Sequence, residues 1–131
     1  MKELSLKDQH ILLLGIAKEF DKVCRDSRIP YYMLGGTMLG AIRHKGFIPW
    51  DDDMDFGVPR PYYERLISAL EEQLPVRYRC CTYDNSRNII YPFIKIEDTH
   101  TKCHNGQYQD EEGQMHCKDC AEGTYSPKLK F

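Results

Sequence analysis

The sequence predicts a mixed α/β (α+β) domain in which helices and short strands follow one another along the chain. Two observations support this class. Apolar residues recur at helical spacing in two stretches, and short apolar runs bounded by glycine or proline lie between and after them. The expected order is helix, strand, helix, strand, helix, strand, strand. A chain of 131 residues suits one domain with a modest core.

The first half of the chain supplies a long helix, a strand and a short helix. Ser5 and Asp8 resemble a capping box that opens the first helix. The apolar run at 30–34 stops at two glycines, which is typical of a buried strand. Residues 37–45 are then expected to form a short helix. The buried stripe of the first helix is expected to be Leu13, Ile16, Ala17, Phe20 and Val23.

The second half supplies a strand, a helix and two further strands. Residues 51–58 alternate weakly between polar and apolar and suit a strand. Pro61 is well placed in the first turn of the next helix. Residues 76–83 and 89–97 are the last strand candidates. The apolar stripe of the helix is expected to be Tyr63, Leu66, Ile67, Leu70 and Leu74.

Composition argues against several functional classes. The net charge of −2 gives no reason to expect a nucleic acid partner, because domains that bind nucleic acid usually carry a basic surplus. The longest apolar run, Ile11–Ala17, is far too short for a transmembrane segment. The N-terminal residues show no cleavage-site pattern of a secretory signal. We therefore expect a cytoplasmic protein.

A candidate phosphate site lies where the first expected strand stops at Gly35 and Gly36. A turn from strand to helix exposes backbone N–H groups, glycine lets a ligand approach them, and the helix dipole favours an anion. Thr37 can cap the helix or donate its hydroxyl to the phosphate. The glycine spacing fits neither a P-loop nor a Rossmann fingerprint. A strand-to-helix turn without any ligand is the alternative.

A cluster of aspartates indicates a metal site. On an extended chain Asp51, Asp53 and Asp55 would share one face, with Asp52 on the other. Converging carboxylates repel one another, so a divalent cation is expected, and hard oxygen ligands favour Mg²⁺ or Mn²⁺. A solvated acidic loop is the alternative. The large apolar residues expected to anchor this segment in a core are Trp50, Met54 and Phe56.

Three basic residues lie between the glycines and the aspartates. Arg43 is a candidate catalytic residue, and His44 and Lys45 are candidates for substrate binding. Cations at this place could neutralise phosphates as negative charge builds on a leaving group. Equally, they could form the exposed end of a short helix, where the helix dipole favours them.

The segment GGTMLGAIRHKGFIPWDDDMDFGV, residues 35–58, resembles the signature of the LicD family, phosphocholine transferases of the nucleotidyltransferase superfamily. Fukutin-related ribitol-phosphate transferases share this core. The resemblance covers about residues 4–101, including YPFIKIEDTHT at 91–101. It implies a nucleotidyltransferase-like core, apparently truncated, in which helices flank a short mixed sheet.

The resemblance also implies a reaction and its residues. It implies metal-dependent transfer of a phospho-alcohol group, such as phosphocholine, from a CDP-activated alcohol donor to a sugar hydroxyl. The acceptor would be a glycan, such as lipopolysaccharide or teichoic acid. The positions that match the phosphate-contacting turn are Gly35, Gly36 and Thr37, and those that match the metal ligands are Asp53, Asp55 and the additional Asp51.

The residues after 101 depart from that family. Residues 102–131 contain almost no aliphatic side chain before Leu129, so we expect a polar tail that is mobile or packs on the core only by its edges. Residues 103–126 resemble a cysteine-rich repeat of the ephrin-receptor or TNF-receptor-like kind. The tail cysteines could form disulfides, bind zinc with nearby histidines, or stay reduced. The chain thus divides into a core at 1–101 and a tail at 102–131.

Two functional hypotheses follow. LicD relatives continue after the core into a strand with a further carboxylate, and nothing like it occurs in this sequence. If Glu97 or Asp98 substitutes for that carboxylate, the chain is a metal-dependent transferase. Otherwise it is a catalytically inactive remnant fused to a cysteine-rich binding module.

Overall fold

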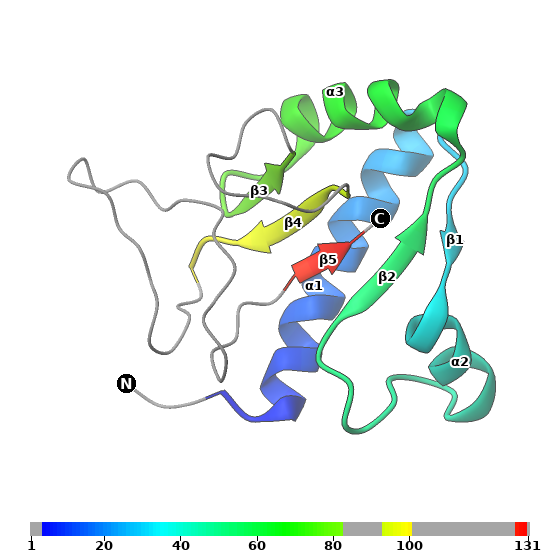
Figure 1. The fold of residues 1–131 in the computed structure, drawn as a ribbon. Coiled ribbons are helices and arrows are strands. Elements are labelled where there is room, and N and C mark those ends of the chain that lie inside the picture. Colours follow the sequence, from blue (N-terminus) through cyan, green and yellow to red (C-terminus); the bar gives the residue numbers. More distant parts are fainter. Residues whose placement is uncertain (1–3, 83–92, 101–127, 131) are drawn as a thin grey trace.

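The computed structural model describes residues 4–82, 93–100 and 128–130, and these form a mixed α/β structure, which confirms the predicted class. Figure 1 shows the elements in space. In chain order they are α1 (Leu6–Asp26), β1 (Tyr32–Met33), α2 (Gly35–Arg43), β2 (Met54–Gly57), the 3₁₀ turn η1 (Arg60–Tyr62), α3 (Tyr63–Gln73), β3 (Tyr78–Cys81), β4 (Lys95–Asp98) and β5 (Lys128–Lys130).

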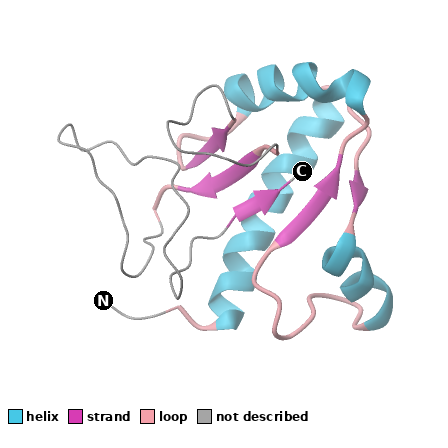
Figure 2. Cartoon of the chain, viewed as in Figure 1, coloured by secondary structure: helices cyan, strands magenta, loops and turns pink. Residues whose placement is uncertain are grey.

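The strands form one mixed sheet of five strands in the order β1-β2-β5-β4-β3. Strand β2 pairs with β1 in antiparallel and with β5 in parallel orientation. Strand β4 is antiparallel to both β5 and β3. Helix α1 runs across one face of this sheet, and α3 packs on α1 and β3 (Figure 2). Helix α2 lies beside the N-terminal end of β2, where it positions the candidate site.

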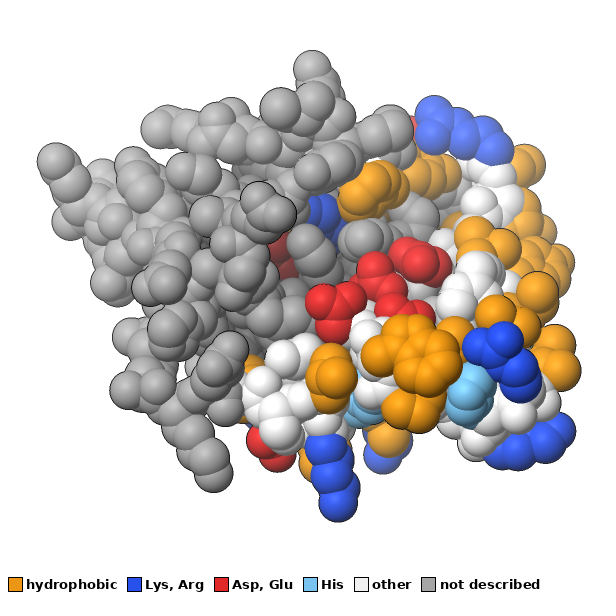
Figure 3. Space-filling model, turned by 60° about the horizontal axis from the view of Figure 1, so that its bottom comes forward, with side chains coloured by type: hydrophobic (Ala, Val, Ile, Leu, Met, Phe, Trp, Pro, Cys, Tyr) orange, Lys and Arg blue, Asp and Glu red, His pale blue; other side chains and the backbone are white. Residues whose placement is uncertain are grey.

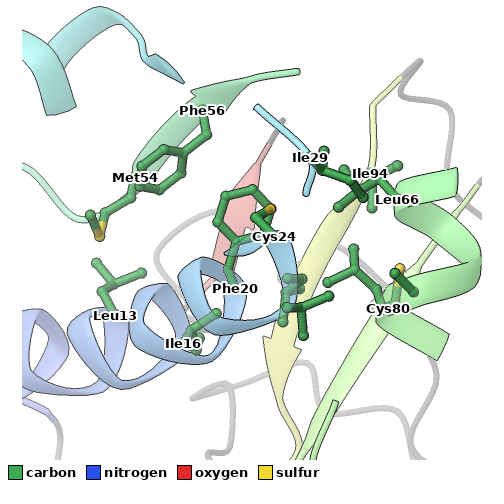
Figure 4. Packing of buried hydrophobic residues seen from close by; sticks show 14 residues of the cluster. Leu13, Ile16, Phe20, Cys24, Ile29, Met54, Phe56, Leu66, Cys80 and Ile94 are labelled. Atoms are coloured by element: carbon green, nitrogen blue, oxygen red, sulfur yellow. The ribbon is translucent and has the colours of Figure 1, made fainter. Parts of the chain in front are cut away.

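Helix α1 supplies the centre of the core, as its periodicity predicts. Its capping box is present, because the Asp8 N–H donates to the Ser5 hydroxyl and the Ser5 N–H donates to the Asp8 carboxylate. The ring centroids of Phe20 and Phe56 are 5.3 Å apart. Figure 4 shows this packing. The predicted stripe is confirmed: Leu13, Ile16, Phe20 and Val23 are buried, and Ala17 packs against them half-buried.

The two faces of the sheet differ in character. Met54 and Phe56 of β2 and Ile96 of β4 are buried in the cluster with α1. Because side chains alternate along a strand, Asp55 belongs to the opposite face. By the same alternation Lys95 belongs to that face as well. One face of the sheet is therefore core, and the other carries Asp55 and Lys95.

Strand β5 was not predicted. Lys128–Lys130 lies between β2 and β4, so the expectation that the whole tail is mobile or packs only by its edges is wrong for these residues. Backbone hydrogen bonds place a strand in a sheet, and three residues are too few to show a sequence period. The tail cysteines lie outside the described residues.

Other boundaries also differ from the prediction. Strand β1 lies at the sheet edge with its two side chains exposed, so it is not a buried strand. Helix α2 begins at Gly35, so both glycines belong to its first turn. Strand β2 begins at Met54, which leaves residues 51–53 in a loop.

Candidate active site

The glycine turn joins β1 to α2 beside β2. The Leu34 N–H donates to the Asp55 carbonyl over 3.0 Å, which fixes the chain just before the helix. Gly35 has φ +50°, a left-handed conformation that glycine adopts without steric penalty. No side chain caps α2. The N–H groups of its first turn are therefore left without the side-chain partner that the Thr37 capping hypothesis would supply.

Two aspartates approach this turn. A Cβ atom placed on Gly36 would lie 2.5 Å from Oδ2 of Asp51, so only glycine leaves room for that carboxylate. A Cβ atom placed on Gly35 would lie 3.8 Å from Oδ2 of Asp55. The two glycines thus allow carboxylates to lie against the first turn of α2.

Thr37 connects the turn to β2 by another route. Its hydroxyl oxygen accepts a hydrogen bond from the Asp55 N–H over 2.8 Å. The hydroxyl therefore holds the backbone of an aspartate in place, and its own proton can still be donated to a further acceptor.

Three carboxylates gather in the loop before β2. Asp51, Asp52 and Asp53 each place a carboxylate oxygen within 4.8 Å of the others, and Asp55 is not part of this group. In Figure 3 acidic side chains gather in a hollow on this side of the molecule. The expected position of Asp52 on the opposite face is wrong. Strict alternation holds only along a strand, and these residues precede it.

The electrostatics of the loop favour a cation. Burial raises the pKa of Asp51 above its usual value, and repulsion from the neighbouring Asp53 raises it further. The Asp52 N–H donates to Oδ1 of Asp51 over 3.1 Å, which opposes this increase. A divalent cation would relieve both the burial cost and the repulsion.

Helix α1 holds the aspartate loop through His10, which the sequence analysis did not select. His10 Nε2 donates to the Asp51 carbonyl over 2.5 Å. Its ring stacks on Phe47 with centroids 4.2 Å apart. A histidine within an apolar helix gives no sequence signal of such a contact, because the partner lies forty-one positions away.

A small cavity adjoins the aspartates. Its volume is about 170 Å³, and Asp51 and Asp53 form part of its wall. This volume suits a small substituent rather than a whole nucleotide, since drug-sized pockets run from about 300 Å³ upward. The apolar part of the lining is Leu14, Met33, Ala41, Phe47, Ile48 and Met54.

The basic residues do not line this cavity. Arg43, His44 and Lys45 are exposed at the C-terminal end of α2, and none of them lines the cavity. The His44 ring contacts the Trp50 ring edge-on, with centroids 5.9 Å apart. Trp50 is 70% exposed, so the expectation that it anchors the loop in the core is wrong. Met54 and Phe56 are buried and perform that role.

The two candidates for a further carboxylate differ. The buried Asp98 accepts hydrogen bonds from Arg77 Nε and Nη2, over 3.0 and 2.7 Å, and from the His100 N–H. Its carboxylate therefore stabilises the end of β4. Glu97 is half-buried and, by alternation with Ile96, belongs to the face that carries Asp55.

Comparison with known proteins decides the family. Residues 28–116 match the profile described as LicD/FKTN/FKRP, nucleotidyltransferase domain. The chain belongs to this family. The match includes the glycine turn and the aspartate loop, so both features lie within the part of the chain that resembles LicD-type domains. The division at residue 101 stays a prediction.

Three groups of relatives illustrate the similarity. The chain is 40% identical over 85 residues to the lipopolysaccharide cholinephosphotransferase LicD of Haemophilus influenzae, covering 65% of this chain and 32% of that protein. It is 50% identical over 30 residues to the ribitol 5-phosphate transferase FKRP of human and mouse, covering 23% of this chain and 6% of each relative. It is 41% identical over 46 residues to protein RP689 of Rickettsia prowazekii, covering 35% of this chain and 17% of that protein.

The chain thus spans about a third of the length of the LicD relative and less of the others. No solved structure matches it significantly. Among the helices in the described ranges, none has the length and apolar character that a membrane span requires.

Proposed function

We propose that this domain transfers a phospho-alcohol group from a CDP-activated alcohol, such as CDP-choline, to a sugar hydroxyl of a glycan. The observation that carries the proposal is the gathering of three carboxylates beside the first turn of α2. Family membership and the cholinephosphotransferase and ribitol 5-phosphate transferase names of its relatives support phospho-alcohol transfer as the reaction class.

The residues fit a divalent cation. Octahedral Mg²⁺ binds oxygens at about 2.0–2.1 Å, so two of its ligands lie at most about 4.2 Å apart. The carboxylate oxygens of Asp51, Asp52 and Asp53 lie within 4.8 Å of one another, so small side-chain rotations bring them together. We assign Mg²⁺ or Mn²⁺ to Asp51 and Asp53 of this group. We propose Asp55, which lies outside the group but next to the glycine turn, as a further ligand.

Each group has a role in this proposal. A bound metal supplies charge stabilisation for the pyrophosphate and lowers the pKa of the attacking hydroxyl. The first turn of α2, with Gly35 and Gly36, offers N–H groups to a donor phosphate. Glu97 is our candidate proton acceptor, because strand alternation assigns it to the face that carries Asp55, whereas Asp98 lies on the other face and binds Arg77. The exposed cations Arg43, His44 and Lys45 would contact parts of the substrates that extend beyond the aspartate loop.

Calorimetric titration with Mg²⁺ tests the metal site. Asp53→Asn should weaken Mg²⁺ binding at least tenfold, because it removes a charged ligand from a cluster of three. The matched control is Asp26→Asn, which removes the same charge from the exposed end of α1. Equal Mg²⁺ affinity in all three proteins would mean that the cluster is only an acidic loop.

Release of CMP from CDP-choline, in parallel with CDP-ribitol and with a glycan acceptor, tests the reaction. Metal-dependent release that Asp53→Asn abolishes would support the transferase. The second candidate is an inactive remnant, favoured by the contact that engages Asp98, one of the two candidates for the further carboxylate, with Arg77. It predicts Mg²⁺ binding without release of CMP from either donor.

A further inference from the structure

The small cavity beside the aspartates has no role in the function proposed above. Its wall comes from several elements: α1 supplies Leu14, β1 supplies Met33, α2 supplies its first turn and Ala41, and the loop before β2 supplies Phe47 among others. Leu14 and Met33 are 44% and 42% exposed, so the cavity borders the surface at these two residues. A ligand can therefore reach it from solvent.

The size of the cavity limits what it can hold. Ala41 contributes only a methyl group to the wall and Gly46 no side chain, which leaves a volume of about 170 Å³. An apolar cavity of about 150 Å³ is sufficient to bind benzene. A compact group of about six carbon-sized atoms therefore fits, whereas a nucleoside is too large.

The cavity is continuous with the proposed phosphate and metal sites. Gly36 and Thr37 of the first turn of α2 form part of its wall. Asp51 and Asp53 of the aspartate loop form another part. In a CDP-activated alcohol, the alcohol is bonded directly to one phosphate and the nucleoside to the other. With the first of these phosphates at the turn of α2, the alcohol is the part of the donor that reaches the cavity.

The lining of the cavity is mostly apolar, which distinguishes between alcohols. A polyol would bury hydroxyl groups against apolar side chains, and a buried hydroxyl without a partner is costly. The methyl groups of a trimethylammonium need no hydrogen bond, and a ring such as that of Phe47 attracts the cation. The Phe47 ring is fixed in the wall because it stacks on His10, with centroids 4.2 Å apart. The selection does not depend on free carboxylates, since Asp51 accepts a backbone N–H and Asp53 has contacts of its own.

We propose that this cavity binds the alcohol end of the donor and selects the trimethylammonium group of choline over a polyol such as ribitol. The proposal rests on the function proposed above and adds the residues that determine the choice of donor. These are Leu14, Ala41 and Phe47, which contact the alcohol rather than the phosphates or the metal.

Calorimetric titration of CDP-choline, CDP-ribitol and CDP, each with Mg²⁺, tests the selection in the wild-type chain. CDP-choline should bind at least about tenfold more tightly than CDP-ribitol, the gain expected from burying two or more methyl groups. A preference of less than about threefold, or a preference for CDP-ribitol, would overturn the inference and leave the proposed function intact. A chain that binds none of the three compounds would overturn both proposals.

Ala41→Leu tests the cavity by filling it, with a residue that is also a good helix former. It should weaken binding of CDP-choline about tenfold and change the affinity for CDP, which lacks the alcohol, by no more than about twofold. The matched control Ser68→Leu adds the same side chain on the exposed surface of α3 and should change neither affinity. Unchanged binding of CDP-choline by Ala41→Leu would overturn the inference. Equal losses for CDP and CDP-choline would also overturn it, because they mark general damage to the site.

Leu14→Ala tests the same cavity without crowding it. This change enlarges the cavity at a half-exposed position, so the fold should be little affected. The preference for CDP-choline over CDP-ribitol should fall at least about threefold, because the methyl groups lose an apolar contact. An unchanged preference would contradict the assignment of Leu14 to the alcohol site.

Discussion

The two faces of the sheet show how one short strand serves two purposes. On β2, Met54 and Phe56 pack against α1, while Asp55 between them belongs to the face with the glycine turn and the aspartate loop. The first face is apolar and buried, and the second carries carboxylates and a buried lysine. Neighbouring residues therefore affect different properties: Asp55 affects the chemistry of the site, and Met54 and Phe56 affect folding.

The largest effect should come from the apolar face. Phe20→Ala removes a fully buried ring at the centre of the cluster and should lower the free energy of unfolding by about 3–5 kcal/mol. Urea unfolding followed by circular dichroism measures this change. The Mg²⁺ affinity of the folded fraction should stay the same. A loss of less than about 1 kcal/mol would show that the ring is not central to the core.

A smaller effect, on Mg²⁺ affinity, should distinguish substitutions at Gly36 and Gly46. Gly36→Ala places a methyl group against Asp51 and should lower Mg²⁺ affinity several-fold, because the carboxylate must move away. Gly46→Ala is the matched control, since a Cβ atom there would have no neighbour within 4 Å. Calorimetry of the two variants measures the difference. If both variants bind Mg²⁺ equally well, Asp51 is not held by the turn.

The smallest effect should be a pH dependence of stability that arises from Asp51. Its pKa is raised in the folded state by burial and by Asp53, so the charged form destabilises the fold. The stability contributed by this group is fully present below the usual pKa of 3.8 and is lost as pH rises through the higher folded value. Asp51→Asn should therefore stabilise the domain at pH 7 and have no such effect below pH 3.8. Urea midpoints at the two pH values measure it, and a gain that persists in acid would contradict this account.

Local signals in the sequence were sufficient to predict α1 and the turn at Gly35 and Gly36. Ser5, Asp8 and the buried stripe of α1 act within a few residues of one another, so period and capping chemistry determine them together. Gly35 and Gly36 likewise indicate a turn, although they lie inside the helix rather than before it.

Features that depend on contacts between residues far apart in the sequence could not be predicted from the sequence. The edge position of β1 follows from which strand pairs with β2, and the place of β5 follows from backbone pairing across the whole chain. Trp50 is exposed, and the Asp52 carboxylate lies near those of Asp51 and Asp53, because the residues just before Met54 form a loop rather than a strand. The choice between Glu97 and Asp98 needed the contact with Arg77, which comes from β4 pairing with its neighbour.

The position of β5 has a consequence for how the chain folds. Among the strands that the structure describes, β5 alone connects the pair β1–β2 to the pair β3–β4, and it pairs Met54 with Leu129 from far along the chain. Contacts between such distant segments form slowly, because the loop must close before any hydrogen bond is gained. Until synthesis reaches residue 130, β2 and β4 each present an unpaired edge to which other chains can add strands. A nascent chain is therefore most prone to aggregation during the interval between completion of β4 and the arrival of β5.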